Sequence, residues 1–282
     1  MANAPRLLKL LIYYLLSDTN ILLSDKKNFM CNFSAVGSFH QKTNSMKKIL
    51  YAFLMLISLH SFAQQTIIND KNAQVRNVAS FNAIKVSGAI EVYLSQSSSE
   101  AVAVSATEEK FRDKIKTEVV NGVLKIYFDG DRLSWNEGNK KLKAYVSFKD
   151  INALDASGAS SFKITGDISV SNLNLKLSGA SDIKGNVKIS KLVVDLSGAS
   201  QVNISGAVDN IDIEASGASD VKSYDLTADE CSVKASGASD IRITVNKEIS
   251  VNATGASSVF YKGDAVIKNI HTNGASSVSK KS

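Results

Sequence analysis

A tetrapeptide, Ser-Gly-Ala-Ser, recurs through the second half of the chain at nearly constant spacing. It begins at Ser157, Ser178, Ser197, Ser216 and Ser236, and relaxed copies begin at Thr254 and Asn273. Successive copies start 21, 19, 19, 20, 18 and 19 residues apart. A period near twenty with a fixed turn motif is typical of a solenoid, in which each repeat is stable only when stacked on its neighbours.

The residues around the tetrapeptide indicate which kind of solenoid. With its first residue counted as position 0, positions −5, −3 and −1 are apolar in the five copies that begin at Ser178 to Thr254, as in Leu173, Leu175 and Leu177, and the positions between them are mostly polar. Position +5 is apolar in every copy. This period of two predicts strands with one buried face. We therefore expect an all-β, right-handed parallel β-helix with coils of about 20 residues over 151–282.

The corner residues have separate expected roles. Glycine adopts positive φ without a Cβ penalty, as a sharp corner requires. We expect alanine to be the small residue that fits inside the corner. The two serines are expected to form hydroxyl ladders that bond corner amides and carbonyls from coil to coil. A serine stripe that binds sugar is the alternative interpretation, but repetition in every coil favours a stacking role.

Residues 81–150 form a divergent β segment. Ser87-Gly88-Ala89-Ile90 keeps the apolar grid of the repeat, with Val86 before it and Val92 after it. Further alternating strands are predicted at 102–105, 115–119, 124–128 and 142–148, with an Asn121-Gly122 hairpin turn and a short helix over 108–114. This segment is expected to cover one end of the solenoid, whose strand edges would otherwise be open.

The leader predicts export. Met46-Lys47-Lys48 is a basic start, residues 49–59 are apolar, and Ser61-Phe62-Ala63 ends on small residues, as in a Sec signal peptide over 46–63. Residues 1–45 are then a non-native upstream extension, and 64–80 a linker. The alternative, a membrane anchor over 7–23, is interrupted by Lys9 and Asp18. We expect a periplasmic or outer-surface protein without a membrane span.

Charge argues against nucleic acid as a partner. The chain has 33 Lys and Arg against 27 Asp and Glu, but seven of the basic and two of the acidic residues lie in 1–63. The remainder is therefore close to neutral, whereas a nucleic-acid binder needs a basic surface. Cys231 is left alone after the leader, so no intrachain disulfide is expected.

The part of the sequence after the leader is poor in catalytic groups. His271 is its one histidine, and Cys231 takes the apolar −5 position, which predicts a buried thiol. The sequence has no phosphate-binding glycine loop and no metal-spaced Cys or His cluster. We expect a protein that is not an enzyme, with no catalytic residue, no cofactor and no bound metal.

The candidate binding residues are three acids and a tryptophan. Asp182, Asp220 and Asp240 share position +4, and such a column could bind calcium through carboxylate oxygens. Serine takes this position in other coils, which favours a solvated face. Trp135, in the long irregular stretch 129–141, either stacks on a sugar ring or plugs the core.

The sequence resembles the head GIN domain family, which is described as a putative auto-transporter adhesin and is common in Bacteroidetes. Ile84-Lys85-Val86-Ser87-Gly88, Val92-Tyr93-Leu94 and Gly122-Val123-Leu124-Lys125-Ile126 carry the resemblance, together with the repeated corners. It covers residues 80–278. It implies an exported β-helical adhesin and supplies no catalytic residue.

Three functions are compatible with these features. The leading hypothesis is a non-enzymatic binding module that presents a rigid face to glycan or to a cell-envelope protein. The second is a carbohydrate-active enzyme on the same scaffold, which would need two carboxylates facing each other across a groove. The third is a structural or assembly factor of the envelope.

Overall fold

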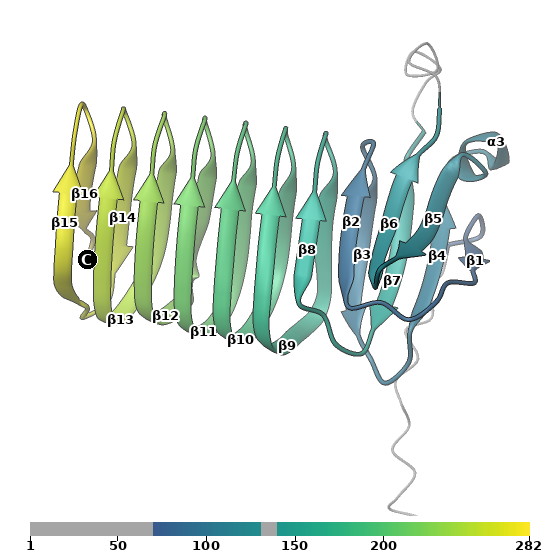
Figure 1. The fold of residues 1–282 in the computed structure, drawn as a ribbon, viewed down its shortest axis with the longest axis horizontal. Coiled ribbons are helices and arrows are strands. Elements are labelled where there is room, and N and C mark those ends of the chain that lie inside the picture. Colours follow the sequence, from purple (N-terminus) through teal and green to yellow (C-terminus); the bar gives the residue numbers. More distant parts are fainter. Residues whose placement is uncertain (1–69, 131–139) are drawn as a thin grey trace, which may run out of the picture. The chain divides into compact units, whose positions relative to one another are not determined.

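The computed structural model describes residues 70–130 and 140–282, which form a β-solenoid of about seven turns with coils of about 19 residues. Strand makes up 66% of the structure and helix 2%. In Figure 1 the coils stand side by side, with their sharp corners at the top. The expected all-β solenoid is therefore confirmed.

Long parallel strands build the solenoid. They are β8 (Ala153–Ala156), β9 (Ser161–Leu177), β10 (Asp182–Leu196), β11 (Gln201–Ala215), β12 (Asp220–Ala235), β13 (Asp240–Ala253), β14 (Ser258–Lys262), β15 (Val266–Thr272) and β16 (Ser277–Lys280). Equivalent residues of successive repeats are paired, so Leu177 lies beside Leu196 and Leu196 beside Ala215. This register places each repeat position in a column that runs along the solenoid.

The columns predicted to be apolar form one continuous core. Leu173, Leu192 and Ile211 at position −5 are at most 2% exposed. Position +5 is equally buried from Phe162 to Val259, and only the last copy, Val278, is partly exposed. Each such side chain stabilises the fold by about 1.5–3 kcal/mol when it is fully buried. The predicted period of two is confirmed.

The predicted roles of the corner residues are partly wrong. Ala199 lies on the outside of its corner, whereas Ser200 faces inward and is 1% exposed. The Ser200 hydroxyl donates to the carbonyl of Ser197, 2.9 Å away in the same corner, and the other inward serines repeat this contact. A buried hydroxyl is tolerated because it is hydrogen-bonded, and it satisfies a carbonyl that alanine would leave without this donor.

The serine that opens each corner makes the contact between coils. Ser216 Oγ donates to the carbonyl of Leu196 at 3.1 Å, and Ser236 Oγ to that of Ala215 at 3.3 Å. Main-chain hydrogen bonds also join the corners of adjacent coils, such as that from Ala199 N–H to the carbonyl of Gly179 at 2.7 Å. The hydroxyl ladder from coil to coil is therefore confirmed for the first serine. The fourth serine bonds within its own corner in most coils, and Ser257 and Ser276 also donate to carbonyls of the preceding coil, Ala235 at 3.4 Å and Ala253 at 2.9 Å.

Glycine is required at the corner for two reasons. Gly198 has φ of 75°, in the left-handed region that L side chains rarely adopt. A Cβ added at Gly198 would also lie 2.5 Å from the carbonyl oxygen of Gly179 in the preceding coil. The corners therefore stack main chain on main chain, at a separation that leaves no room for a side chain.

The divergent segment begins with one more coil. Its elements are β1 (Gln74–Arg76), β2 (Ala83–Ser87), β3 (Glu91–Gln96), β4 (Ala101–Ser105), α3 (Glu109–Arg112), β5 (Ile115–Val120), β6 (Val123–Phe128) and β7 (Lys143–Phe148). Strand β2 pairs in parallel with β8, and β3 with β9, so the Ser87-Gly88 corner joins the stack as predicted.

The rest of this segment covers one end of the solenoid (Figure 1). Strands β6 and β7 extend the parallel sheets, and β5 and β4 then pair with them antiparallel. Asn121 and Gly122, both at positive φ, form the predicted hairpin turn between β5 and β6. The predicted short helix is α3. Strand β1, within the segment expected to be a linker, pairs antiparallel with β4.

The opposite end carries no comparable cover among the described residues. All of β15 is exposed, including the apolar side chains of Val266, Ile267 and Ile270. Lys281 lies 4.6 Å from the centre of the Phe260 ring, and Lys280 pairs loosely with Asp264. The two ends of the solenoid are thus structurally different.

Several predictions concern residues outside the described ranges. These are the upstream extension 1–45, the signal peptide 46–63, the alternative anchor over 7–23, and Trp135. Across 70–130 and 140–282, no helix has the length and apolar character needed to span a bilayer.

Substituting a corner glycine should destabilise the chain. Gly198→Ala imposes a left-handed alanine and a main-chain clash, so we expect the free energy of unfolding to fall by at least about 2 kcal/mol. Urea unfolding followed by circular dichroism measures this change. The matched control, Ala199→Ser on the exposed neighbour, should stay within about 0.5 kcal/mol of the parent chain. Equal stability of the two variants would contradict the stacking role of the glycine.

Candidate binding face

The strands that follow the corners present two outward columns. We call position +4 the acidic column; it contains Glu91, Ser161, Asp182, Gln201, Asp220, Asp240, Ser258 and Ser277. We call position +6 the basic column; it contains Tyr93, Lys163, Lys184, Asn203, Lys222, Arg242, Phe260 and Ser279. Because residues two apart on a strand share a face, the two columns lie side by side. Together they form the candidate binding face.

The acids predicted from the sequence do form one column. Asp182 lies beside Gln201, Gln201 beside Asp220, and Asp220 beside Asp240. The column is interrupted by neutral residues, as the sequence indicated. Among the described residues, no group of three or more His, Cys, Asp or Glu is arranged to hold a metal ion.

Cations of the basic column neutralise several of these acids. Lys222 Nζ lies 2.9 Å from Asp220 Oδ2, and Arg242 Nη2 lies 2.9 Å from Asp240 Oδ2. Lys163 likewise pairs with Glu91 on the neighbouring strand. These partly exposed pairs contribute less than about 1 kcal/mol each to stability. They place opposite charges next to each other across the two columns.

Two carboxylates on the face keep unused hydrogen-bonding capacity. Asp182 has no ion pair within the described part of the chain, and its burial raises the pKa of its carboxyl, although Lys163 and Lys184 oppose that shift. The Oδ1 atom of Asp240 is buried without a hydrogen-bond partner in the same ranges. The Asp182 carboxylate can accept hydrogen bonds from a ligand, whereas Asp240 Oδ1 is enclosed by the protein.

Aromatic rings lie toward both ends of the basic column. Tyr93 stacks on Tyr145, with ring centres 5.1 Å apart and planes inclined by 19°, and Lys163 Nζ lies 5.5 Å from the Tyr93 ring centre. The Tyr145 hydroxyl donates to Asp70 at 2.8 Å, and burial together with this carboxylate raises the pKa of Tyr145. Phe260 takes the equivalent position near the open end. Partly exposed rings of this kind can stack on sugar rings or side chains.

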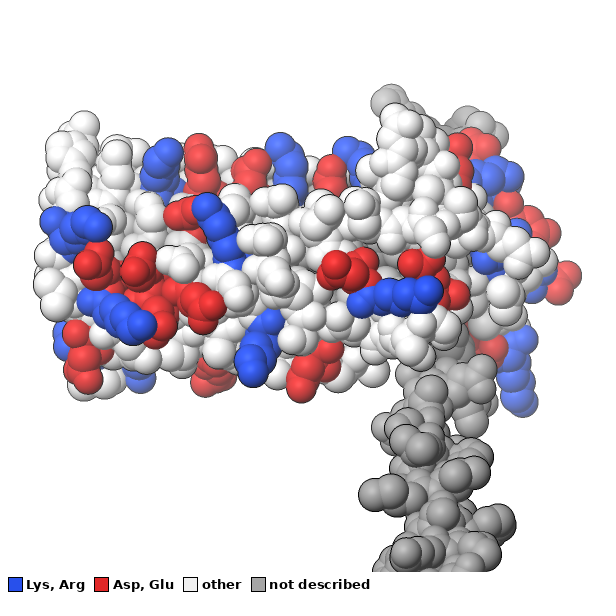
Figure 2. Space-filling model, turned by 60° about the horizontal axis from the view of Figure 1, so that its bottom comes forward, with Lys and Arg blue, Asp and Glu red and all other residues white. Residues whose placement is uncertain are grey.

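A second charged region lies on the strands that precede the corners. Figure 2 shows a face on which acidic and basic side chains are interleaved, with acidic groups concentrated toward the C-terminal coils. In those coils Glu230 and Glu248 occupy adjacent positions, and Lys268 pairs with Glu248 at 3.0 Å. Lys247 pairs with Asp229 at 2.9 Å. The lysines offset the repulsion between neighbouring acids.

The two nucleophile candidates lie apart from this face. Cys231 is 5% exposed and packs between Ile211 and Ile249 in the −5 column, as predicted. Burial raises the pKa of its thiol to about 12, so the thiol is protonated at neutral pH and a poor nucleophile. His271 is exposed on β15 beside Asn252.

Sequence reasoning missed the basic column. Lys163, Lys184, Lys222 and Arg242 recur two residues after the acidic position, so the alignment of repeats already contained this signal. The aromatic pair could not be found in that way. Tyr93 and Tyr145 are far apart in sequence, and only the pairing of β3 with β7 brings them together. Trp135, the fourth predicted binding residue, lies outside the described ranges.

Comparison with known families gives one match. A family model described as "Putative auto-transporter adhesin, head GIN domain" matches residues 80–265. This range contains the divergent segment and nearly all of the repeats. No curated protein matches the chain.

Solved structures share the fold. A putative adhesin from Bacteroides fragilis NCTC 9343 has a TM-score of 0.68 at 20% identity, covering 75% of this chain and 98% of its own. A putative lipid binding protein from Parabacteroides distasonis ATCC 8503 has a TM-score of 0.58 at 20% identity, covering 76% and 98%. A putative adhesin from Parabacteroides merdae ATCC 43184 has a TM-score of 0.56 at 17% identity, covering 74% and 95%.

The buried thiol should be protected until the fold opens. At pH 8 we expect Cys231 in the native chain to resist Ellman's reagent and to react fully in urea beyond the unfolding transition. Because the folded pKa is raised above the usual value near 9, the free energy of unfolding should also fall as pH rises above about 9. Cys231→Val should remove this part of the pH dependence. Rapid labelling of the native thiol would contradict the assignment.

Proposed function

The chain belongs to the head GIN domain family of auto-transporter adhesin-like proteins, and from this we propose that it is an exported, non-enzymatic binding module. Its rigid candidate binding face would contact glycan or another protein of the cell envelope. The observation that carries the proposal is that acidic and basic side chains stand in two adjacent columns, in register along successive coils.

The geometry of the face suits an extended ligand. Equivalent groups repeat once per coil, about 4.8 Å apart, so a polymer lying across the coils meets similar donors and acceptors at regular intervals. The cations supply charge-assisted hydrogen bonds, and Tyr93 and Phe260 supply apolar rings toward the two ends. Asp182, Asp220 and Asp240 are the proposed acceptors within it, and Trp135 remains a proposed additional contact.

The distribution of carboxylates supports a binding role over catalysis. Asp220 and Asp240 each pair with a cation two residues further along their own strand. Glycoside cleavage requires two carboxyl groups on opposite sides of the scissile bond, with separated pKa values. The four-residue corners add no long loop that would build a cleft around either acid.

One coil offers a matched test of the face. Lys222 lies in the basic column of β12, and Lys234 is exposed on the same strand but precedes the next corner. On a glycan array, Lys222→Ala should lower the affinity for bound glycans by about tenfold, as expected for loss of one charge-assisted hydrogen bond. Lys234→Ala removes the same charge and should leave binding unchanged.

The same array separates the competing outcomes. Equal losses in both lysine variants would indicate non-specific charge attraction and would overturn the assignment of the face. Trp135→Ala tests the additional contact, and its effect should add to that of Lys222→Ala if both residues touch one ligand. Array glycans that are cleaved during incubation would instead support the carbohydrate-active alternative.

Export has its own test. We expect a C-terminally tagged chain to fractionate with the periplasm or the outer surface, and deletion of 46–63 to retain it in the cytoplasm. Immunoblotting of the fractions against a cytoplasmic marker measures this distribution. A full-length chain that stays with the cytoplasmic marker would exclude any external partner.

A further inference from the structure

A polar depression of about 370 Å³ lies in the covering segment, away from the candidate binding face. Strand β1 and the residue after it form one wall, and the end of α3 with β5 forms the other. The lining residues are Val75, Arg76, Asn77, Asp113, Ile115, Lys116 and Thr117. Its walls are specific to the covering segment, because β1 and α3 occur once in the described part of the chain.

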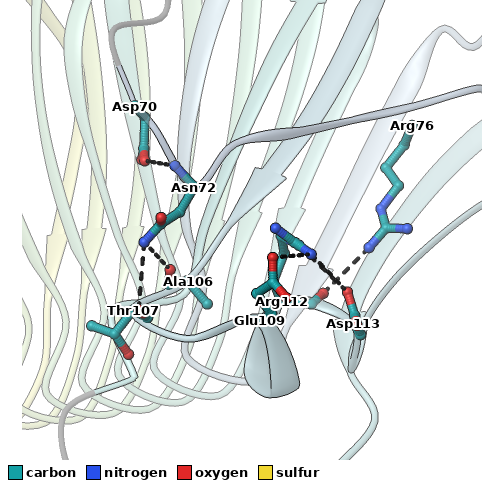
Figure 3. Close-up of polar contacts among 8 residues, drawn as sticks. All are labelled: Asp70, Asn72, Arg76, Ala106, Thr107, Glu109, Arg112 and Asp113. Carbon is teal, nitrogen blue, oxygen red and sulfur yellow. Dashed lines mark hydrogen bonds and ion pairs between the residues drawn. The ribbon is translucent and has the colours of Figure 1, made fainter.

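Arg76 is one of the residues that line this depression. Its Nη2 atom donates to the carbonyl of Arg112 at 3.3 Å, as Figure 3 shows. Its Nε atom is buried and has no hydrogen-bond partner within the described residues. The protein therefore satisfies this guanidinium only in part, and its positive charge is not neutralised by a carboxylate.

A second cation faces the same depression. Lys116 Nζ donates to the carbonyl of Asp113 at 3.3 Å, which leaves two of its three N–H groups free. Neither Arg76 nor Lys116 has an ion pair within the described ranges. The nearby acids are already engaged, because Arg112 pairs with Glu109 and Asp113 at 3.4 Å each (Figure 3). Two positive charges therefore remain without a counter-ion.

We propose that this depression binds an oxyanion, a carboxylate or sulfate carried by a sugar-sized ligand. The Arg76 guanidinium would present its terminal Nη N–H groups to the oxygens of the anion, in the planar geometry that suits such groups. Lys116 would supply the second positive charge, and the Thr117 hydroxyl and Asn77 amide would bond to the rest of the ligand. The site does not depend on the binding face and is a separate activity of the fold.

The architecture explains why the two cations meet. Strand β1 is anchored by its antiparallel pairing with β4 and by Asn72, whose amide donates to the carbonyl of Ala106 at 3.1 Å (Figure 3). Strand β5 is fixed by its hairpin with β6. Both walls are therefore held by pairing before any ligand binds, and a preformed site requires little ordering of the protein on binding.

Titration of the full chain with glucuronate, inorganic sulfate and glucose tests the proposal. We expect glucuronate to bind with a dissociation constant on the order of 1 mM by isothermal titration calorimetry, as a ligand of this size allows. Glucose, which lacks the anion, should not bind detectably. Sulfate binding as tight as that of glucuronate would show that the charge alone is recognised, which still supports an oxyanion site.

Charge-removing variants decide whether binding occurs at this site. Arg76→Gln and Lys116→Gln should each weaken glucuronate binding at least tenfold, whereas Lys110→Gln, on α3 but outside the depression, should have no effect. Lys116 is exposed, so its variant should fold normally even if Arg76→Gln loosens β1. Absence of glucuronate and sulfate binding to the parent chain, or unchanged affinity in Lys116→Gln, would overturn the proposal.

Discussion

The close approach of successive corners is the constraint on which the rest of the structure depends. At the corners from Gly179 onward, each glycine lies against the main chain of the glycine in the preceding coil, at a distance that excludes even a methyl group. Main-chain hydrogen bonds between corners, such as that from Ala199 N–H to the carbonyl of Gly179, then fix the spacing between successive coils. Because the corners are in register, the strands between them are in register, and the apolar columns close into one core.

The same register decides what kind of surface the protein can present. Any side chain that recurs at one repeat position becomes a column, so chemistry on the coils is periodic and spread out. Asp220 and Asp240 illustrate this, because each pairs with a cation of its own coil and the two acids lie side by side in adjacent coils. Convergent sites of the kind that catalysis needs are hard to build this way, whereas long binding faces arise readily.

The depression proposed as an anion site lies in the covering segment, where the periodic repeat ends. The covering segment replaces parallel stacking by antiparallel pairs, and the pairing of β1 with β4 brings Arg76 to the end of α3. Residues that far apart in sequence meet only because the chain reverses there. At the opposite end the last described coils are ordinary repeats without a covering segment, and β15 is exposed along its whole length.

The sequence by itself determined the solenoid, the buried columns, the Asn121-Gly122 hairpin and the core position of Cys231, because repeat spacing and alternation are local signals. It led to the wrong orientation for alanine, since that depends on how a left-handed glycine turns the chain. Only the tertiary structure decided that Tyr93 meets Tyr145 and that Arg76 and Lys116 share a depression. Those contacts depend on long-range strand pairing in the segment where the repeat is lost, and periodicity carries no information about such pairing.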